Sequence, residues 1–225
     1  MKKTINDHPA VNEQLVEKYR AMIDVLSISC VVGDAQERDN VMHSAIKIRT
    51  VNKKFIGPAL TVRLTPGDIV DCLDIFKIAQ PGDVVVIDAF GESETSIWGG
   101  LMSGLANAAG IAGAVIDGSQ RDTDETRLLD LPIASRSVSP RASHSAYSKR
   151  TEPIHINVPV CCGGVIVKPG DLIVADEIGV TVVPSEDMEE ILPLAKEQAD
   201  KEEATRKLIA EGYTVDELLA KFGRI

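Results

Sequence analysis

Short apolar runs alternate with helix-like segments between residues 55 and 135, and this alternation constrains the fold more than any other feature. The runs VVVID (84–88) and GAVID (113–117) are almost wholly apolar, as is typical of parallel strands covered on both faces. Strands are predicted at 57–64, 84–88, 113–117 and 131–135, and helices at 69–79, 101–109 and 123–129. Such an alternation forms βαβ units, so we predict an α/β protein.

The flanking segments have different patterns. Apolar residues recur at helical spacing over the first 28 residues or so, and the N-terminal helical segment is expected to extend to about residue 50. Residues 136–156 are rich in serine and are predicted to form a loop. Closely spaced short strands from 157 to 184 indicate antiparallel pairing, and helices are expected over 185–225. No linker divides the chain, so residues 1–225 are predicted to form a single domain.

Composition excludes several classes of protein. The 225 residues carry 24 Lys plus Arg against 34 Asp plus Glu, and a net charge of −10 disfavours a surface for nucleic acid. No run reaches the roughly 18 apolar residues of a membrane-spanning helix, and the N-terminus lacks the apolar region of a secretory signal. The four cysteines have no zinc-type spacing, so we expect reduced thiols in a cytoplasmic protein.

Two polar, glycine-rich loops are predicted directly after the strands at 84–88 and 113–117, so they should open on the same edge of the sheet. Gly99 and Gly100 precede a helix whose free N–H groups would suit an anion. Arg121 offers a planar fork of donors, and Asp122 is a hard oxygen ligand for Mg²⁺ or Mn²⁺. From the residues alone, a tight loop without a ligand and a surface ion pair remain the competing interpretations.

The combined pattern, Gly100 followed by twenty residues, Arg121-Asp122, two residues and Glu125, resembles the RraA-like family. Further matching segments are GPALTV (57–62), PGDVVVID (81–88), SRSVSPR (135–141), VPVCCGGVIVKPGDLIVAD (158–176) and GVTVVP (179–184). The family includes regulators of ribonuclease activity and metal-dependent 4-hydroxy-4-methyl-2-oxoglutarate aldolases. The resemblance implies a three-layer β/β/α swivelling-domain-like fold with a mixed sheet and with N- and C-terminal helices packed outside. It also implies a homotrimer or homohexamer with interfacial active sites.

The resemblance also assigns roles to these residues. A pyruvyl-type substrate would place its carboxylate on the backbone of Gly99, Gly100, Leu101 and Met102, and its keto oxygen on Arg121. Asp122 would bind Mg²⁺ or Mn²⁺ directly. Family members with established aldolase activity have an acidic residue where this chain has Gly100, and Glu125 is expected to replace it through water.

The implied function is that of a metal-dependent carbon–carbon lyase that cleaves a small 2-oxo acid to pyruvate, by aldol cleavage, by oxaloacetate decarboxylation or by both. A Schiff-base mechanism is disfavoured, because no lysine lies between Lys77 and Lys149, the span that holds both loops. The alternative is a non-catalytic protein that binds an RNA-degrading endonuclease. A methyltransferase is disfavoured because no glycine-rich nucleotide loop follows the first strand.

Overall fold

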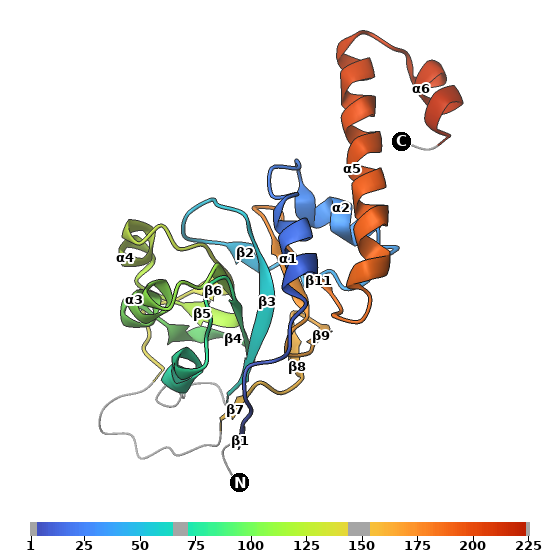
Figure 1. Ribbon diagram of the computed structural model, residues 1–225. Helices are drawn as coiled ribbons and strands as arrows, with labels where there is room; N and C mark the ends of the chain where they lie inside the picture. Colours follow the sequence, from blue (N-terminus) through green and yellow to red (C-terminus); the bar gives the residue numbers. More distant parts are fainter. Residues whose placement is uncertain (1–3, 65–71, 144–153, 224–225) are drawn as a thin grey trace.

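The computed structural model describes residues 4–64, 72–143 and 154–223, in which a mixed sheet is flanked by helices (Figure 1). The strands are β1 (Thr4–Ile5), β2 (Lys47–Ile48), β3 (Phe55–Arg63), β4 (Val84–Trp98), β5 (Gly113–Gln120), β6 (Ile133–Val138), β7 (His155–Ile156), β8 (Val160–Cys162), β9 (Val165–Val167), β10 (Leu172–Ala175) and β11 (Val180–Val183). The helices are α1 (Glu13–Arg20), α2 (Ile28–Asp34), the 3₁₀ helix η1 (Cys72–Lys77), α3 (Gly100–Ala108), α4 (Thr123–Leu128), α5 (Met188–Ala210) and α6 (Val215–Phe222).

The centre of the sheet is parallel and is flanked by antiparallel pairs of β7 with β3 and of β2 with β6, while the edge strand β1 pairs parallel with β7. The main strand order is β1-β7-β3-β4-β5-β6-β2, and β3, β4, β5 and β6 run parallel to one another. β10 pairs antiparallel with both β3 and β11, while β8 and β9 form a separate antiparallel pair. The predictions of an α/β fold with a mixed sheet and of antiparallel pairing after residue 157 are therefore confirmed.

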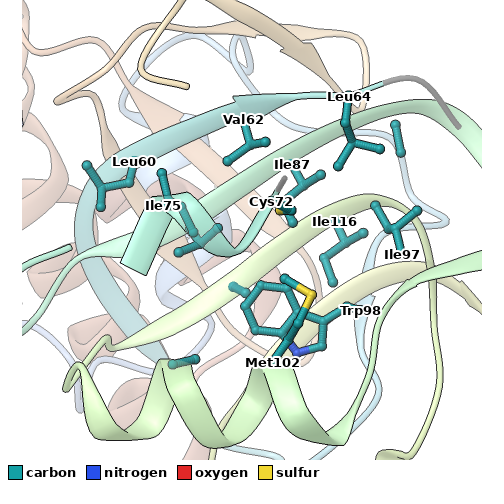
Figure 2. Close-up of a cluster of buried hydrophobic side chains, with 14 of the residues drawn as sticks. Leu60, Val62, Leu64, Cys72, Ile75, Ile87, Ile97, Trp98, Met102 and Ile116 are labelled. Atoms are coloured by element: carbon teal, nitrogen blue, oxygen red, sulfur yellow. The ribbon is translucent and has the colours of Figure 1, made fainter. Parts of the chain in front are cut away.

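The side chains of the central strands divide between two cores. Val85 and Ile87 of β4 join a cluster with Trp98 and Met102, which Figure 2 shows between the sheet and α3. Because side chains alternate along a strand, Val84 and Val86 face the opposite core, with residues of β8 to β11. A third core packs α1, α2 and α5 against β3, β10 and β11. The N- and C-terminal helices thus lie outside the strands, on the side away from α3 and α4 (Figure 1).

Two predictions of helices are wrong. The expected helix over the first 28 residues is only α1, which ends at Arg20; the chain turns over residues 21–27, where Ser27 adopts a left-handed φ of 50°, and α2 begins at Ile28. The segment predicted as a helix at 69–79 contains the 3₁₀ helix η1, and its residues 69–71 lie outside the described part of the chain. The helix predicted at 101–109 is confirmed as α3, with each end one residue earlier.

The prediction of a loop after residue 88 is also wrong, because β4 continues to Trp98. Pairing of β4 with β5 persists through register shifts between Asp88 and Glu92, Glu92 and Ser96, and Ser96 and Trp98. These β-bulges let the polar segment stay in the ladder while it bends. β5 likewise extends to Gln120 rather than ending at Asp117.

The C-terminal segment forms helices as predicted. Thr214 and Glu217 make a complete capping box at the start of α6. α6 and the end of α5 project away from the sheet (Figure 1). Among the described residues, no helix combines the length and apolar character needed to cross a membrane.

Candidate active site

The parallel pairing of β4 and β5 brings the two predicted site segments together. The register ends with Trp98 opposite Gln120, and the N–H of Arg121 donates to the carbonyl of Trp98 at 2.9 Å. α3 begins at Gly100 and α4 at Thr123, so two helices start side by side where these strands end. The prediction that both segments open on one edge of the sheet is confirmed.

The first turn of α3 offers backbone donors. The N–H of Ser103 donates to the carbonyl of Gly99 at 3.0 Å, which is the first helical bond. The N–H groups of Gly100, Leu101 and Met102 therefore lack an acceptor within the helix. Gly100 donates to Oδ2 of Asp122 at 3.0 Å, so the N–H groups of Leu101 and Met102 are left for an anion.

Asp122 lies in a strained position with a reachable carboxylate. It precedes α4 with a left-handed φ of 53°, and its side chain does not cap its own helix. The carboxylate instead contacts the start of α3, with Nε of Arg121 at 3.4 Å from Oδ2. The side chains of Arg121 and Asp122 are 41% and 40% exposed, so a bound molecule can reach both.

Glu125 fills the space beside Gly100. A Cβ atom at Gly100 would lie 1.9 Å from Oε2 of Glu125, and one at Gly99 would lie 2.7 Å from Oδ2 of Asp122. Both carboxylates therefore lie against the same pair of glycines. The absence of a side chain at Gly100 is matched by an acid from α4, one turn after Asp122.

These two carboxylates suit a hydrated divalent cation. The described residues contain no cluster of three or more His, Cys, Asp or Glu side chains that would enclose a metal. Mg²⁺ does not require such a cage, because it commonly keeps several waters and binds through one or two carboxylates together with its substrate. The carboxylate oxygens of Asp122 and Glu125 thus fit a partly hydrated Mg²⁺ or Mn²⁺. They do not form the closed set of ligands of a structural metal site.

A buried network behind the starts of α3 and α4 was not predicted from the sequence. The indole N–H of Trp98 donates to Oγ of Ser103 at 2.9 Å, and Ser103 Oγ lies 2.8 Å from Oγ1 of Thr126. Each hydroxyl also reaches a backbone carbonyl four residues earlier, that of Gly99 from Ser103 and that of Asp122 from Thr126. In the sequence, the one sign of this network is that a hydroxyl residue follows each site residue by four positions, Ser103 after Gly99 and Thr126 after Asp122.

Three other acids, which end or follow apolar runs, accept hydrogen bonds from backbone N–H groups. Asp88 accepts from the N–H groups of Phe90 and Cys161, and Asp117 accepts from the N–H of Gly163. Burial raises the pKa of the Asp88 carboxyl, and these N–H donors oppose the rise. The third, Asp176, is 2% exposed and is surrounded by donors.

Three exposed leucines lie on the two helices that begin at the site, on α3 and α4. Leu101 is 85% exposed and Leu128 is 88% exposed, and Leu105 is exposed as well. Two cavities of about 330 and 470 Å³ lie elsewhere, and neither is lined by Gly99, Gly100, Arg121 or Asp122.

Comparisons with known proteins place the chain in a family. The family model RraA-like (Aldolase/RraA) matches residues 23–182. A protein of Halalkalibacterium halodurans named "Putative 4-hydroxy-4-methyl-2-oxoglutarate aldolase" is 40% identical over 180 residues, which cover 80% of this chain and 83% of that protein.

Solved structures agree with this assignment. A Pseudomonas syringae protein of uncharacterized function has a TM-score of 0.77 at 25% identity, covering 94% of this chain and 99% of that one. RraAS2 of Streptomyces coelicolor, described as an unusual member of the RNase ES inhibitor RraA family, has a TM-score of 0.72 at 29% identity, covering 89% and 98%. The family model matches more than half of the chain, and the chain belongs to the RraA-like (Aldolase/RraA) family.

Proposed function

We propose that this protein is a divalent-metal-dependent carbon–carbon lyase that releases pyruvate from a small 2-oxo acid. The observation that carries the proposal is the meeting of free helix N–H groups, a guanidinium and two carboxylates at the ends of β4 and β5. The aldolase name of the Halalkalibacterium halodurans relative supports the same class of reaction.

Each group has a task in such a reaction. The N–H groups of Leu101 and Met102 bind the substrate carboxylate at the start of α3, where the helix dipole favours an anion. Arg121 donates to the keto oxygen and stabilises the negative charge that develops there as the carbon–carbon bond breaks. Asp122 would hold the cation directly, and Glu125 would hold it through water. The cation, when bound, supplies Lewis-acid polarisation of the keto group.

Two substrate classes share this arrangement. Decarboxylation of oxaloacetate requires only a stabilised enolate, whereas aldol cleavage of 4-hydroxy-4-methyl-2-oxoglutarate also requires a base for the 4-hydroxyl proton. The groups assigned above serve the pyruvyl half that both substrates share. We therefore propose both as substrates. The half of each substrate that lies away from the pyruvyl group would contact residues outside the starts of α3 and α4.

We further propose that a second copy of the chain completes the site, in a homotrimer or homohexamer. The exposed side chains of Leu101, Leu105 and Leu128 beside the site favour coverage by protein. The mass of the protein in solution tests this assembly. A monomer at assay concentration would contradict it.

We propose a cytoplasmic location. Cys30, Cys72, Cys161 and Cys162 are all free thiols, and free thiols are usual in a reducing compartment. Cys161 is exposed while its neighbour Cys162 is buried, as expected for adjacent residues of one strand. Labelling of the folded protein with a thiol reagent should modify the exposed thiols first.

A coupled assay of pyruvate release tests the proposed activity. The protein is assayed with oxaloacetate and with 4-hydroxy-4-methyl-2-oxoglutarate, in the presence of Mg²⁺ or of EDTA. We expect turnover of at least one substrate that EDTA abolishes and added Mg²⁺ restores. Absence of metal-dependent turnover with both would overturn the proposal.

A non-catalytic regulator of an RNA-degrading endonuclease is the second candidate, favoured by the similarity to RraAS2. The net charge of −10 suits binding to basic segments of a partner. Co-purification of an RNA-degrading endonuclease with the wild-type protein, together with inhibition of that enzyme, would support this function. The support for a regulatory function would be clearest if the protein also released no pyruvate.

A further inference from the structure

A buried pair of hydroxyl groups joins the first turns of α3 and α4. Ser103 lies on α3 and Thr126 on α4, their side-chain oxygens are 2.8 Å apart, and both residues are fully buried. On its far side, the pair accepts a hydrogen bond from the indole of Trp98, which lies in the apolar core (Figure 2). The pair therefore anchors both helix starts to the core of the protein.

The same hydroxyl groups contact the backbone of the site. Ser103 Oγ lies 3.2 Å from the carbonyl of Gly99, and Thr126 Oγ1 lies 3.1 Å from the carbonyl of Asp122. Either hydroxyl can donate across the contact between them, so the chain of bonds ends on Asp122 or on Gly99. In both arrangements the network fixes the start of α4 relative to the start of α3.

Asp122 depends on that relative position. Its carboxylate does not cap α4 but reaches across to the N–H of Gly100, and its left-handed backbone is an uncommon conformation for a residue other than glycine. A small shift of α4 would lengthen the Gly100–Asp122 bond and redirect the carboxylate. Partners behind metal ligands commonly set ligand orientation, and losing one costs roughly 10- to 100-fold in metal affinity or activity.

We infer that Ser103 and Thr126 are positioning residues that aim the Asp122 carboxylate at the divalent cation, with Trp98 as their anchor. This inference rests on the proposed function, because that function assigns the cation to Asp122. It predicts that removing one buried hydroxyl, without touching Asp122 itself, weakens metal binding.

Titration calorimetry with Mn²⁺ on the intact protein tests the inference. Thr126→Val keeps the shape of the side chain and removes its hydroxyl, and Thr126→Ser keeps the hydroxyl. The matched control is Thr205→Val, because Thr205 is also buried and also donates to a carbonyl four residues earlier, that of Lys201, but on α5. Thermal denaturation of each variant separates a loss of folding from a loss of binding.

We expect Thr126→Val to weaken Mn²⁺ binding by about 10-fold or more, Thr126→Ser to restore near wild-type affinity, and Thr205→Val to leave it unchanged. If Thr126→Val does not fold, Ser103→Ala tests the same pair with the same expectation. If Thr126→Val, or Ser103→Ala in its place, bound Mn²⁺ with wild-type affinity, the inference would be overturned while the proposed metal site would stand. A wild-type protein that binds no Mn²⁺ would overturn the proposed metal site and the inference with it.

Discussion

Asp122 and Asp176 both follow buried strands, but their surroundings differ. Asp176 is 2% exposed and accepts from the N–H groups of Ser29, Ile178 and Gly179 and from the hydroxyl of Ser29. Asp122 is 40% exposed, and its described partners are the N–H of Gly100 and the guanidinium of Arg121. A carboxylate whose lone pairs are filled by backbone donors fixes a turn, whereas one with few partners and an open face can bind a ligand.

We use this difference in exposure and in hydrogen-bond donors to distinguish acids that stabilise the fold from acids of the candidate site. Equal replacements at the two positions should therefore affect different properties, activity at Asp122 and stability at Asp176. The following changes test that division, beginning with the largest expected effect.

Asp122→Asn should lower metal-dependent pyruvate release by at least about 100-fold, more than the loss of an outer partner of a metal site. Asparagine keeps an acceptor for the N–H of Gly100 and tolerates the left-handed backbone, so stability should change by less than about 0.5 kcal/mol. The coupled assay and urea denaturation measure the two effects. Unchanged turnover would contradict the role of Asp122.

Arg121→Lys should lower turnover by about 10- to 100-fold, because lysine keeps the charge but not the planar fork of donors. The side chain is 41% exposed, so the unfolding transition should scarcely move. Steady-state kinetics with oxaloacetate provide the measurement. A variant as active as the wild type would mean that charge alone suffices at this position.

Asp176→Asn should reduce the free energy of unfolding by about 1–3 kcal/mol, because the amide NH2 replaces one of the two accepting oxygens and leaves at least the N–H of Ser29 without its acceptor. Activity per folded molecule should be retained. Urea denaturation at neutral pH, followed by circular dichroism, measures the loss. If this variant were stable but inactive, the division between the two acids would fail.

Glu125→Ala should weaken metal-dependent activity by about 10-fold, as expected for a ligand that acts through water. Adding Gly100→Asp to that variant should restore most of the activity, because the new carboxylate enters the space that Glu125 occupied. Gly100→Asp alone serves as the control, in which Glu125 must move away from a Cβ atom 1.9 Å from its oxygen. Equal activity in the single alanine variant and the wild type would remove Glu125 from the site.

Asp88 should have the smallest effect, visible in the pH dependence of stability. Burial raises the pKa of its carboxyl in the folded protein, so its protonated form favours folding at low pH, and this contribution is lost as the pH rises above 3.8. Asp88→Asn cannot ionise, so its stability relative to the wild type should increase from pH 4 to pH 7. Urea midpoints at both pH values measure the change, and a constant difference would contradict it.

Much of this arrangement could be predicted from the chain. The runs at 84–88 and 113–117 indicated neighbouring parallel strands, and a polar segment after each indicated a shared edge. The pairing of Trp98 with Gln120 places Arg121 and Gly99 at that edge. The presence of α3 and α4 followed from local spacing and turn residues, which act over a few positions.

Long-range partners set the features that could not be predicted. β4 extends to Trp98 because β5 accepts its polar segment through β-bulges, and no local pattern specifies that pairing. The contact between Ser103 and Thr126 joins residues 23 positions apart. The end of α1 at Arg20 could not be predicted either, because apolar residues continue at helical spacing to Leu26.

The position of a bound metal tests whether Asp122, and not a structural acid such as Asp176, binds the divalent cation. Crystals of the wild-type protein grown with Mn²⁺ would show the ion by its anomalous scattering, with Asp122→Asn and Asp176→Asn crystals as the matched pair. We expect one ion in contact with the Asp122 carboxylate, retained in Asp176→Asn and lost in Asp122→Asn. An ion bound at another carboxylate, or no ion beside Asp122 at saturating Mn²⁺, would contradict it.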